Sequence, residues 1–221
     1  YPMGVNWSSG IECGIRLVNL VWAISFLDDY PIFETDQLLI NRFVCFNAKR
    51  LYRYPSKYSS ANNHLLAEGL GLFVAGLFFP HLDASRRWLK LGKKILDTEA
   101  DRQILPDGGS FEYSTSYLPF VIDFFLFYRH ICKNLSLEYS LVVDERLKNS
   151  CCFIQSIMDS NGHVPNIGDQ DNAQLIDFGI SNGETFTSII NTGSALFNET
   201  RLLPGLIDLK TWMIAEKAYL N

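Results

Sequence analysis

The longest apolar stretch of the chain directly follows a cluster of polar residues. Residues 65–79 contain one charged side chain, Glu68, and come just after Asn62, Asn63 and His64. A helix with no polar face must be covered on all sides, so this stretch is predicted to form a buried helix around which the others pack. Polar groups at the tip of such a helix indicate a functional site.

The rest of the chain repeats its apolar residues with the spacing of helices, and no stretch alternates as a strand would. Ser9 and Glu12 have the form of a capping box, Ser59 or Ser60 is the expected cap of the buried helix, and Pro119 confines the cap of a later helix to 115 or 116. The pattern therefore predicts an all-α fold, with helices at about residues 9–27, 35–52, 60–79, 83–104, 116–131, 136–160, 184–197 and 208–219.

Short connections make consecutive helices antiparallel neighbours, so the first, third and fifth helices should run parallel to one another. Their first residues then share one end of the molecule, to which the polar loop after residue 160 also returns. Helix N-termini offer unpaired N–H groups and the positive end of the helix dipole. This end is therefore predicted to tolerate an anionic ligand, and it gathers Asn6, Trp7, Asn62, Asn63, His64, Glu112, Tyr117 and residues 169–172.

Composition narrows the class of partner. The 221 residues are 48% hydrophobic and 19% charged, which suits a single domain spanning residues 1–221. The net charge of −5 gives no attraction for nucleic acid, and no apolar run reaches the ~20 residues that insertion into a membrane requires. The first residue is Tyr1 and the last helical pattern is unfinished, so the chain is expected to be truncated at both ends.

The five cysteines are an odd number without a CxxC spacing, a pattern that predicts free, buried thiols rather than a disulfide framework. Free thiols favour a reducing compartment, so this feature points to the cytoplasm.

Four segments, in order along the chain, resemble the heparinase II/III-like polysaccharide lyase family. They are Asn6-Trp7 with Glu12, Arg16 and Asn19; residues 59–64 with 77–80; residues 103–108 with 111–114 and Tyr117; and residues 165–171. The resemblance implies an incomplete (α/α) toroid of antiparallel helical hairpins that lacks its C-terminal β-sandwich domain. It also implies β-elimination of a uronate-containing acidic polysaccharide, of the heparan or alginate type, by a bacterial periplasmic or secreted protein.

Such an elimination needs a neutralised uronate carboxylate, a base, and an acid for the leaving oxygen. By the resemblance, Asn63 and His64 hold the carboxylate and Tyr117 is the acid, with a role as base left open. A helix N-terminus and nearby positive groups are expected to favour the Tyr117 phenolate. Leu118 follows Tyr117 where family members often carry histidine, and Tyr113 is the alternative catalytic tyrosine.

The other polar residues of this end are candidate substrate contacts. Arg16 forms either a surface ion pair with Glu12 or part of a polar lining. Glu68 is expected to support His64 or Arg16, and His163 is either a site residue or a turn residue. The predicted substrate-binding set is Asn6, Trp7, Arg16, Asn62, Glu68, Glu112, Tyr113, Asp169 and Asp171.

Two other functions remain open. A toroid glycoside hydrolase would use paired carboxylates such as Glu68 and Glu112, and a non-catalytic polysaccharide-binding domain would use Trp7 as a platform. No cofactor or metal is predicted, because His64 and Glu68 lack an obvious third ligand and the 169–172 segment has Gln174 where a calcium loop needs glycine. The isolated chain is expected to be nearly inactive, since the resemblance implies a further catalytic histidine on the absent β-sandwich domain.

Overall fold

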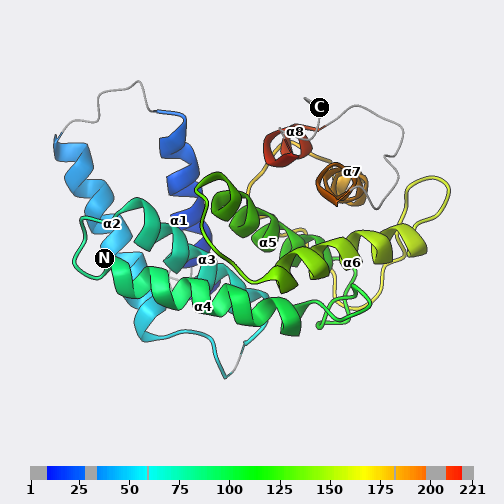
Figure 1. Ribbon diagram of the computed structural model, residues 1–221, viewed down its shortest axis with the longest axis horizontal. Helices are drawn as coiled ribbons and strands as arrows, with labels where there is room; N and C mark the ends of the chain where they lie inside the picture. Colours follow the sequence, from blue (N-terminus) through cyan, green and yellow to red (C-terminus); the bar gives the residue numbers. More distant parts are fainter. Residues whose placement is uncertain (1–8, 28–33, 59, 182, 198–207, 216–221) are drawn as a thin grey trace. The chain divides into compact units, whose positions relative to one another are not determined.

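The computed structural model describes residues 9–27, 34–58, 60–181, 183–197 and 208–215, and these residues form an all-α fold (Figure 1). The predicted fold class is confirmed. The helices in the described part of the chain are α1 (Gly10–Ser25), α2 (Glu34–Arg53), α3 (Asn63–Phe78), α4 (Ser85–Gln103), α5 (Tyr117–Asn134), α6 (Leu141–Ile157), α7 (Thr185–Phe197) and α8 (Leu209–Ala215).

The chain divides into two compact units, residues 1–98 and residues 99–221, with the boundary inside α4. Between α4 and α5, the turn predicted at residues 106–109 is closed by an isolated antiparallel bridge between Ile104 and Ser110. None of the helices in the described ranges combines the length and apolar character that crossing a bilayer requires.

Helix α3 is the centre of the first unit, as the sequence predicted. Thirteen of its sixteen residues are buried. Helix α1 packs closely against it at Gly14, where an added Cβ would lie 2.5 Å from the carbonyl carbon of Ala67. Gly10 meets the Glu68 side chain and Gly14 meets Gly71, so both helices advance in the same direction. The predicted parallel course of these two helices is confirmed.

Helix α4 lies antiparallel to α3, and glycines again allow the approach. A Cβ at Gly69 would lie 2.7 Å from a methyl carbon of Ile95, while one at Gly76 would lie 2.5 Å from the carbonyl oxygen of Ser85. The start of α4 is therefore level with the end of α3. In the first unit, the glycine contacts therefore fix how far along α3 each of its neighbours, α1 and α4, begins.

Two helix starts differ from prediction in the group that caps them. Ser9 is the N-cap of α1 but forms no side-chain cap hydrogen bond, and Glu12 pairs with Arg16 at 2.6 Å instead of completing a capping box. The cap of α3 is Asn62, whose side-chain oxygen accepts from the His64 N–H. The predicted Ser59 or Ser60 cap is therefore wrong; Ser59 itself lies outside the described residues.

The second unit is built on α5, whose apolar residues are almost all buried. Helix α6 packs beside it, with Arg129 and Asp144 paired at 2.7 Å. The predicted start of α6 near residue 136 is wrong, because Ser136 has a φ of 53°, a left-handed conformation that a right-handed helix cannot contain.

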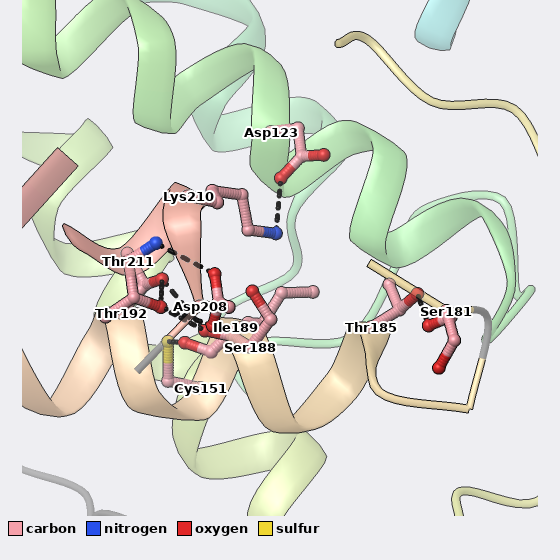
Figure 2. A network of polar contacts seen from close by, with 10 residues as sticks. All are labelled: Asp123, Cys151, Ser181, Thr185, Ser188, Ile189, Thr192, Asp208, Lys210 and Thr211. Carbon is pink, nitrogen blue, oxygen red and sulfur yellow. Dashed lines mark hydrogen bonds and ion pairs between the residues drawn. The ribbon is translucent and has the colours of Figure 1, made fainter. Parts of the chain in front are cut away.

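Polar groups join the last two helices to the core of the second unit (Figure 2). Lys210 of α8 pairs with Asp123 of α5 at 3.1 Å, and both side chains are largely buried. Thr192 of α7 and Thr211 of α8 share a hydrogen bond of 2.8 Å. The short helix α8 is therefore held through charge and hydroxyl contacts as well as apolar packing.

All five cysteines are free, as predicted. Cys13, Cys132 and Cys151 are buried, and Cys151 lies within the network of Figure 2. The predicted burial is wrong for Cys152, which is exposed because it occupies the solvent side of α6 beside the inward-facing Cys151, and for Cys45, which is half-buried.

Candidate functional site

The first candidate group lies at the start of α3. Asn63 is buried, whereas Asn62 and His64 are half-buried. The Asn62 side-chain oxygen accepts from the His64 backbone N–H at 3.3 Å, which fixes where the helix begins. Asn63 and His64 are therefore the first two residues of α3, where the helix dipole favours negative charge.

Glu68 lies one turn deeper and has no exposed surface. Its carboxylate accepts from the Ser56 backbone N–H at 2.7 Å and from the Ser56 hydroxyl at 2.6 Å. The prediction that it supports His64 or Arg16 is wrong, because these bonds instead hold the segment that precedes α3. A fully buried carboxylate is also unsuited to the exposed acid pair of a hydrolase.

The electrostatics of Glu68 follow from this position. Burial raises the pKa of its carboxyl group, while the two Ser56 hydrogen bonds and the Arg50 charge act in the opposite direction. Gly10, the first residue of α1, has no side chain and so leaves room for the Glu68 carboxylate. The group therefore ties together α1, α3 and the segment between α2 and α3.

On α1, Arg16 and Glu12 form an ion pair, and both side chains are partly exposed. This agrees with the surface-pair interpretation, and substrate binding by Arg16 stays a prediction. Asn6 and Trp7, which were predicted to bind substrate, lie outside the described residues.

The second candidate group lies at the start of α5, where three consecutive hydroxyl residues bind a distant loop. The hydroxyls of Ser114 and Ser116 donate to the carbonyl oxygen of Asp169 at 2.6 and 2.7 Å. Thr115 exchanges hydrogen bonds with Ile167, its N–H donating to the Ile167 carbonyl and its hydroxyl accepting from the Ile167 N–H, both at 3.0 Å. The predicted return of this loop to the start of α5 is confirmed.

Sequence reasoning missed Ser114 and Thr115 as residues that organise this site. The signal was the run of three hydroxyls from 114 to 116 directly before a helix. Ser114 also supplies the cap, since its hydroxyl accepts from the Tyr117 N–H at 3.1 Å, whereas Ser116 at the predicted cap position forms no side-chain cap hydrogen bond. Below, we call residues 114–116 with 165–171 the hydroxyl clamp.

Tyr113, the alternative catalytic tyrosine, immediately precedes the clamp. Its φ is 52°, a left-handed conformation that costs a non-glycine residue about 1–2 kcal/mol. Gly168 packs against its carbonyl group, and the side chain is 75% exposed. Backbone strain of this kind is concentrated at functional sites, so Tyr113 is held in place beside the clamp at a conformational cost.

Tyr117 is the first residue of α5, as predicted, and is half-buried. Burial raises the pKa of its phenol, and the nearby carboxylates of Asp171, Asp169 and Glu112 raise it further. The expected phenolate, stabilised by positive groups, is therefore wrong for this unit, where the charges that act on the ring are negative. A phenol that keeps its proton can donate it.

A pocket of about 230 Å³ adjoins the clamp. Its polar lining consists mainly of side-chain amides, with one carboxylate from Asp171 and an aromatic ring from Phe186; the lining residues are Ser116, Pro119, Asn166, Gln170, Asp171, Asn172, Ala173, Gln174, Thr185 and Phe186. Amides both donate and accept hydrogen bonds, which suits the hydroxyl groups of a sugar. Within the described ranges, no three His, Cys, Asp or Glu side chains are grouped closely enough to hold a metal ion.

The predicted site residues thus form two groups. The start of α3 carries Asn62, Asn63 and His64 in the first unit, and the hydroxyl clamp brings together Glu112, Tyr113, Tyr117, Asp169 and Asp171 in the second. The convergence of the two groups on one substrate stays a prediction.

Comparison with known proteins identifies relatives over most of the chain. A family model described as heparinase II/III N-terminus matches residues 3–179. A heparin-sulfate lyase of Pedobacter heparinus is 32% identical over 161 residues, which are 72% of this chain and 24% of that protein. A heparin-sulfate lyase of Bacteroides stercoris is 36% identical over 80 residues, 36% of this chain and 11% of that protein. The chain thus spans a quarter or less of these relatives.

Solved structures show the same fold. The heparan sulfate lyase HepC from Pedobacter heparinus matches 71% of this chain and 24% of its own, with 25% identity and a TM-score of 0.56. Heparinase III matches 90% of this chain and 31% of its own, with a TM-score of 0.69 at 17% identity; this likeness concerns the fold alone. The all-α architecture therefore corresponds to a part of these larger proteins.

Proposed function

The chain belongs to the heparinase II/III N-terminal domain family, and we propose on that basis that it is the helical part of a polysaccharide lyase. The proposed reaction is β-elimination in a uronate-containing acidic polysaccharide of the heparan or alginate type. Relatives named heparin-sulfate lyases support this assignment. The proposed partners are the polysaccharide itself and a C-terminal β-sandwich domain of the same protein.

The observation that carries the proposal is the setting of Tyr117. The hydroxyl clamp holds the first turn of α5 through bonds to a loop more than fifty residues away. Burial and three carboxylates raise the pKa of the Tyr117 phenol above its usual 10.0, so the phenol is protonated at neutral pH and up to higher pH than a free tyrosine. We assign Tyr117 the role of proton donor to the glycosidic oxygen as the bond to the uronate breaks.

Asn63 and His64 are proposed to bind the uronate carboxylate. An amide and an imidazole both donate hydrogen bonds to a carboxylate, and the first turn of α3 favours negative charge. Neutralising that carboxylate stabilises the negative charge that develops when the neighbouring carbon loses its proton. The raised pKa of Tyr117 leaves almost no phenolate at neutral pH, so the base is proposed to come from another group, such as the histidine that the family resemblance places on the β-sandwich domain.

The test is digestion of heparan sulfate, hyaluronan and alginate by the full reading frame that contains these 221 residues. Elimination creates a conjugated double bond that absorbs ultraviolet light. Tyr117→Phe is expected to lower the rate at least ~100-fold, the scale of a lost general acid, while Tyr113→Phe, the same chemical change four residues earlier, leaves it within a fewfold of the parent.

Other outcomes would point elsewhere. Chain cleavage without ultraviolet absorbance would indicate a hydrolase, and binding without cleavage would indicate a non-catalytic domain. Full activity of Tyr117→Phe would exclude the assigned role, and loss of activity in Tyr113→Phe alone would transfer that role to Tyr113. The isolated chain is expected to show little or no turnover, and rapid turnover by these residues alone would contradict the need for a second domain.

The pH profile separates the acid role from the base role. The phenol acts when protonated, and its pKa lies above the usual value of 10.0. Activity should therefore not fall on the alkaline side through loss of the Tyr117 proton until the pH exceeds about 10. A rate that rises with pH and reaches its plateau only when a tyrosine ionises would instead indicate that Tyr117 is the base.

A further inference from the structure

The first unit carries a second concave surface, formed by the C-terminal half of α2 and the start of α4. One pocket of about 540 Å³ is lined by Lys49, Tyr52, Arg53, Ala84, Arg87 and Trp88. A neighbouring pocket of about 330 Å³ shares four of these residues and adds Cys45, His81, Leu82 and Asp83. The shared lining makes the two pockets one continuous surface, which we call the α2–α4 groove.

The groove concentrates positive charge. Lys49 and Arg53 come from α2 and Arg87 from α4, and all three are exposed. In the part of the chain that the structure describes, none of the three forms an ion pair with a carboxylate. Asp83 is the one carboxylate among the lining residues, and it lines only the smaller of the two pockets. Three uncompensated cations in a chain of net charge −5 form a local field that favours anions.

Not every cation of α2 belongs to the groove. Arg50 acts on the buried groups Cys13 and Glu68, lowering the pKa of each against the effect of burial. Arg50 therefore serves the interior of the first unit. Lys49 and Arg53, on the neighbouring faces of the same helix, are left to the groove.

The groove also offers aromatic surface. Trp88 lines both pockets but is only 1% exposed, so the aromatic surface open to a ligand is the Tyr52 ring, which is 40% exposed. Guanidinium groups bind sulfate and carboxylate through paired hydrogen bonds, and a partly exposed aromatic ring gives an apolar face for a sugar ring. Cations and an aromatic ring together suit an acidic sugar better than a small inorganic anion.

The α4 side of the groove lies far from the start of α3. Gly76 near the end of α3 packs against Ser85 and Leu89, which places Arg87 level with the end of α3. His64 is twelve residues earlier in α3, about 18 Å away along the helix axis. An oligosaccharide segment held at Arg87 therefore does not occupy the positions of Asn63 and His64.

We propose that the α2–α4 groove is a second, non-catalytic binding site for a sulfated or carboxylated segment of the polysaccharide. Lys49, Arg53 and Arg87 hold its anionic groups, and Tyr52 packs on a sugar ring. The choice of a polysaccharide as the ligand rests on the proposed function. Such a site keeps a long polymer attached while a different segment reacts.

The test compares two triple variants that remove the same charge. Lys49→Gln/Arg53→Gln/Arg87→Gln empties the groove of cations, whereas Arg86→Gln/Lys90→Gln/Lys94→Gln removes three exposed cations of α4 that line neither pocket. Binding of a size-defined heparin oligosaccharide to the full-length protein is measured by calorimetry. The groove variant should bind at least ~10-fold more weakly, and the α4 control within roughly twofold of the parent.

Equal weakening by both variants would show a diffuse field and overturn the proposal, as would unchanged affinity in the groove variant. Inorganic sulfate and a neutral dextran oligosaccharide are the comparison ligands. Competition by sulfate at equal concentration of anionic groups would reassign the groove to free anions, and equal binding of dextran would exclude recognition through charge.

A measurement on the unaltered protein covers the case in which the groove variant fails to fold. Bound heparin oligosaccharide should slow acetylation of Lys49 several-fold and leave Lys90 and Lys94 unchanged; an unprotected Lys49 would overturn the proposal. Ultraviolet absorbance of the product is followed in parallel. Groove-dependent binding without elimination would sustain this site and refute the proposed function, whereas elimination without groove-dependent binding would do the reverse.

Discussion

The packing of α1 on α3 makes a sharp prediction for Gly14→Ala. A Cβ at this position would lie 2.5 Å from the Ala67 carbonyl carbon and nearer still to its oxygen, whereas ordinary contact begins at 3.4 Å. The opposing atoms belong to the backbone of α3, so no side chain can rotate away. The two helices must separate by roughly 1 Å to admit the methyl group.

The net effect combines two opposing contributions. Alanine improves helix propensity by about 1 kcal/mol over glycine. Overpacking costs about 1–3 kcal/mol, and the fixed backbone of α3 places this case at the upper end. The expected result is a loss of about 2 kcal/mol in the free energy of unfolding, or about 4–8 °C in Tm for a protein of this size.

Thermal unfolding followed by circular dichroism measures this change. Gly183→Ala is the matched control, since a Cβ there meets nothing within 4 Å and should change stability by less than about 0.5 kcal/mol. A Tm for Gly14→Ala equal to or above that of the parent would refute the close backbone contact, and with it the parallel packing that sets the start of α3 against the start of α1.

Three further substitutions or labels test buried groups. Because burial raises the pKa of Glu68 above its usual 4.5, the folded chain binds that proton more tightly than the unfolded chain. The free energy of unfolding should therefore fall as the pH rises from 4.5 through the raised pKa. Glu68→Gln should flatten this part of the pH dependence measured by urea unfolding, and an unchanged slope would contradict the linkage. Lys210→Met leaves Asp123 as a buried, unpaired carboxylate (Figure 2) and should lower the free energy of unfolding by about 3–5 kcal/mol. Adding Asp123→Asn should restore much of this loss. Denaturant midpoints that show no such recovery would argue against the pair. Burial raises the pKa of Cys151 to about 12, so iodoacetamide at neutral pH should label the exposed Cys152 first, and mass spectrometry that finds Cys151 labelled equally fast would contradict its burial.

The fold class could be predicted because helical periodicity is local information. The apolar run after His64 identified α3 as the buried helix, and Pro119 placed the start of α5 within a residue or two. Helix caps were harder, because several hydroxyl and amide side chains near each start compete to accept the same N–H. At α3 the choice of Asn62 over a serine depends on the path of the chain around Ser56 and Glu68, which no local pattern records.

The candidate site divides in the same way. The residue types at the start of α3 and α5 suggested a binding site, and their resemblance to a lyase family was confirmed over residues 3–179. The charge around Tyr117 was predicted with the wrong sign. Burial raises the pKa of its phenol, and Asp171 and Asp169 raise it further from a loop more than fifty residues later in the chain.

The sequence by itself determined that this protein is all-α, which helix is buried, which residues begin the helices near the site, and to which family the chain belongs. Tertiary structure decided what those residues experience: Glu68 binds Ser56, the hydroxyl clamp holds the loop against α5, and burial and nearby carboxylates raise the pKa of the Tyr117 phenol. The reason is that periodicity and motifs act over a few residues, whereas burial and electrostatic interaction depend on distance in space.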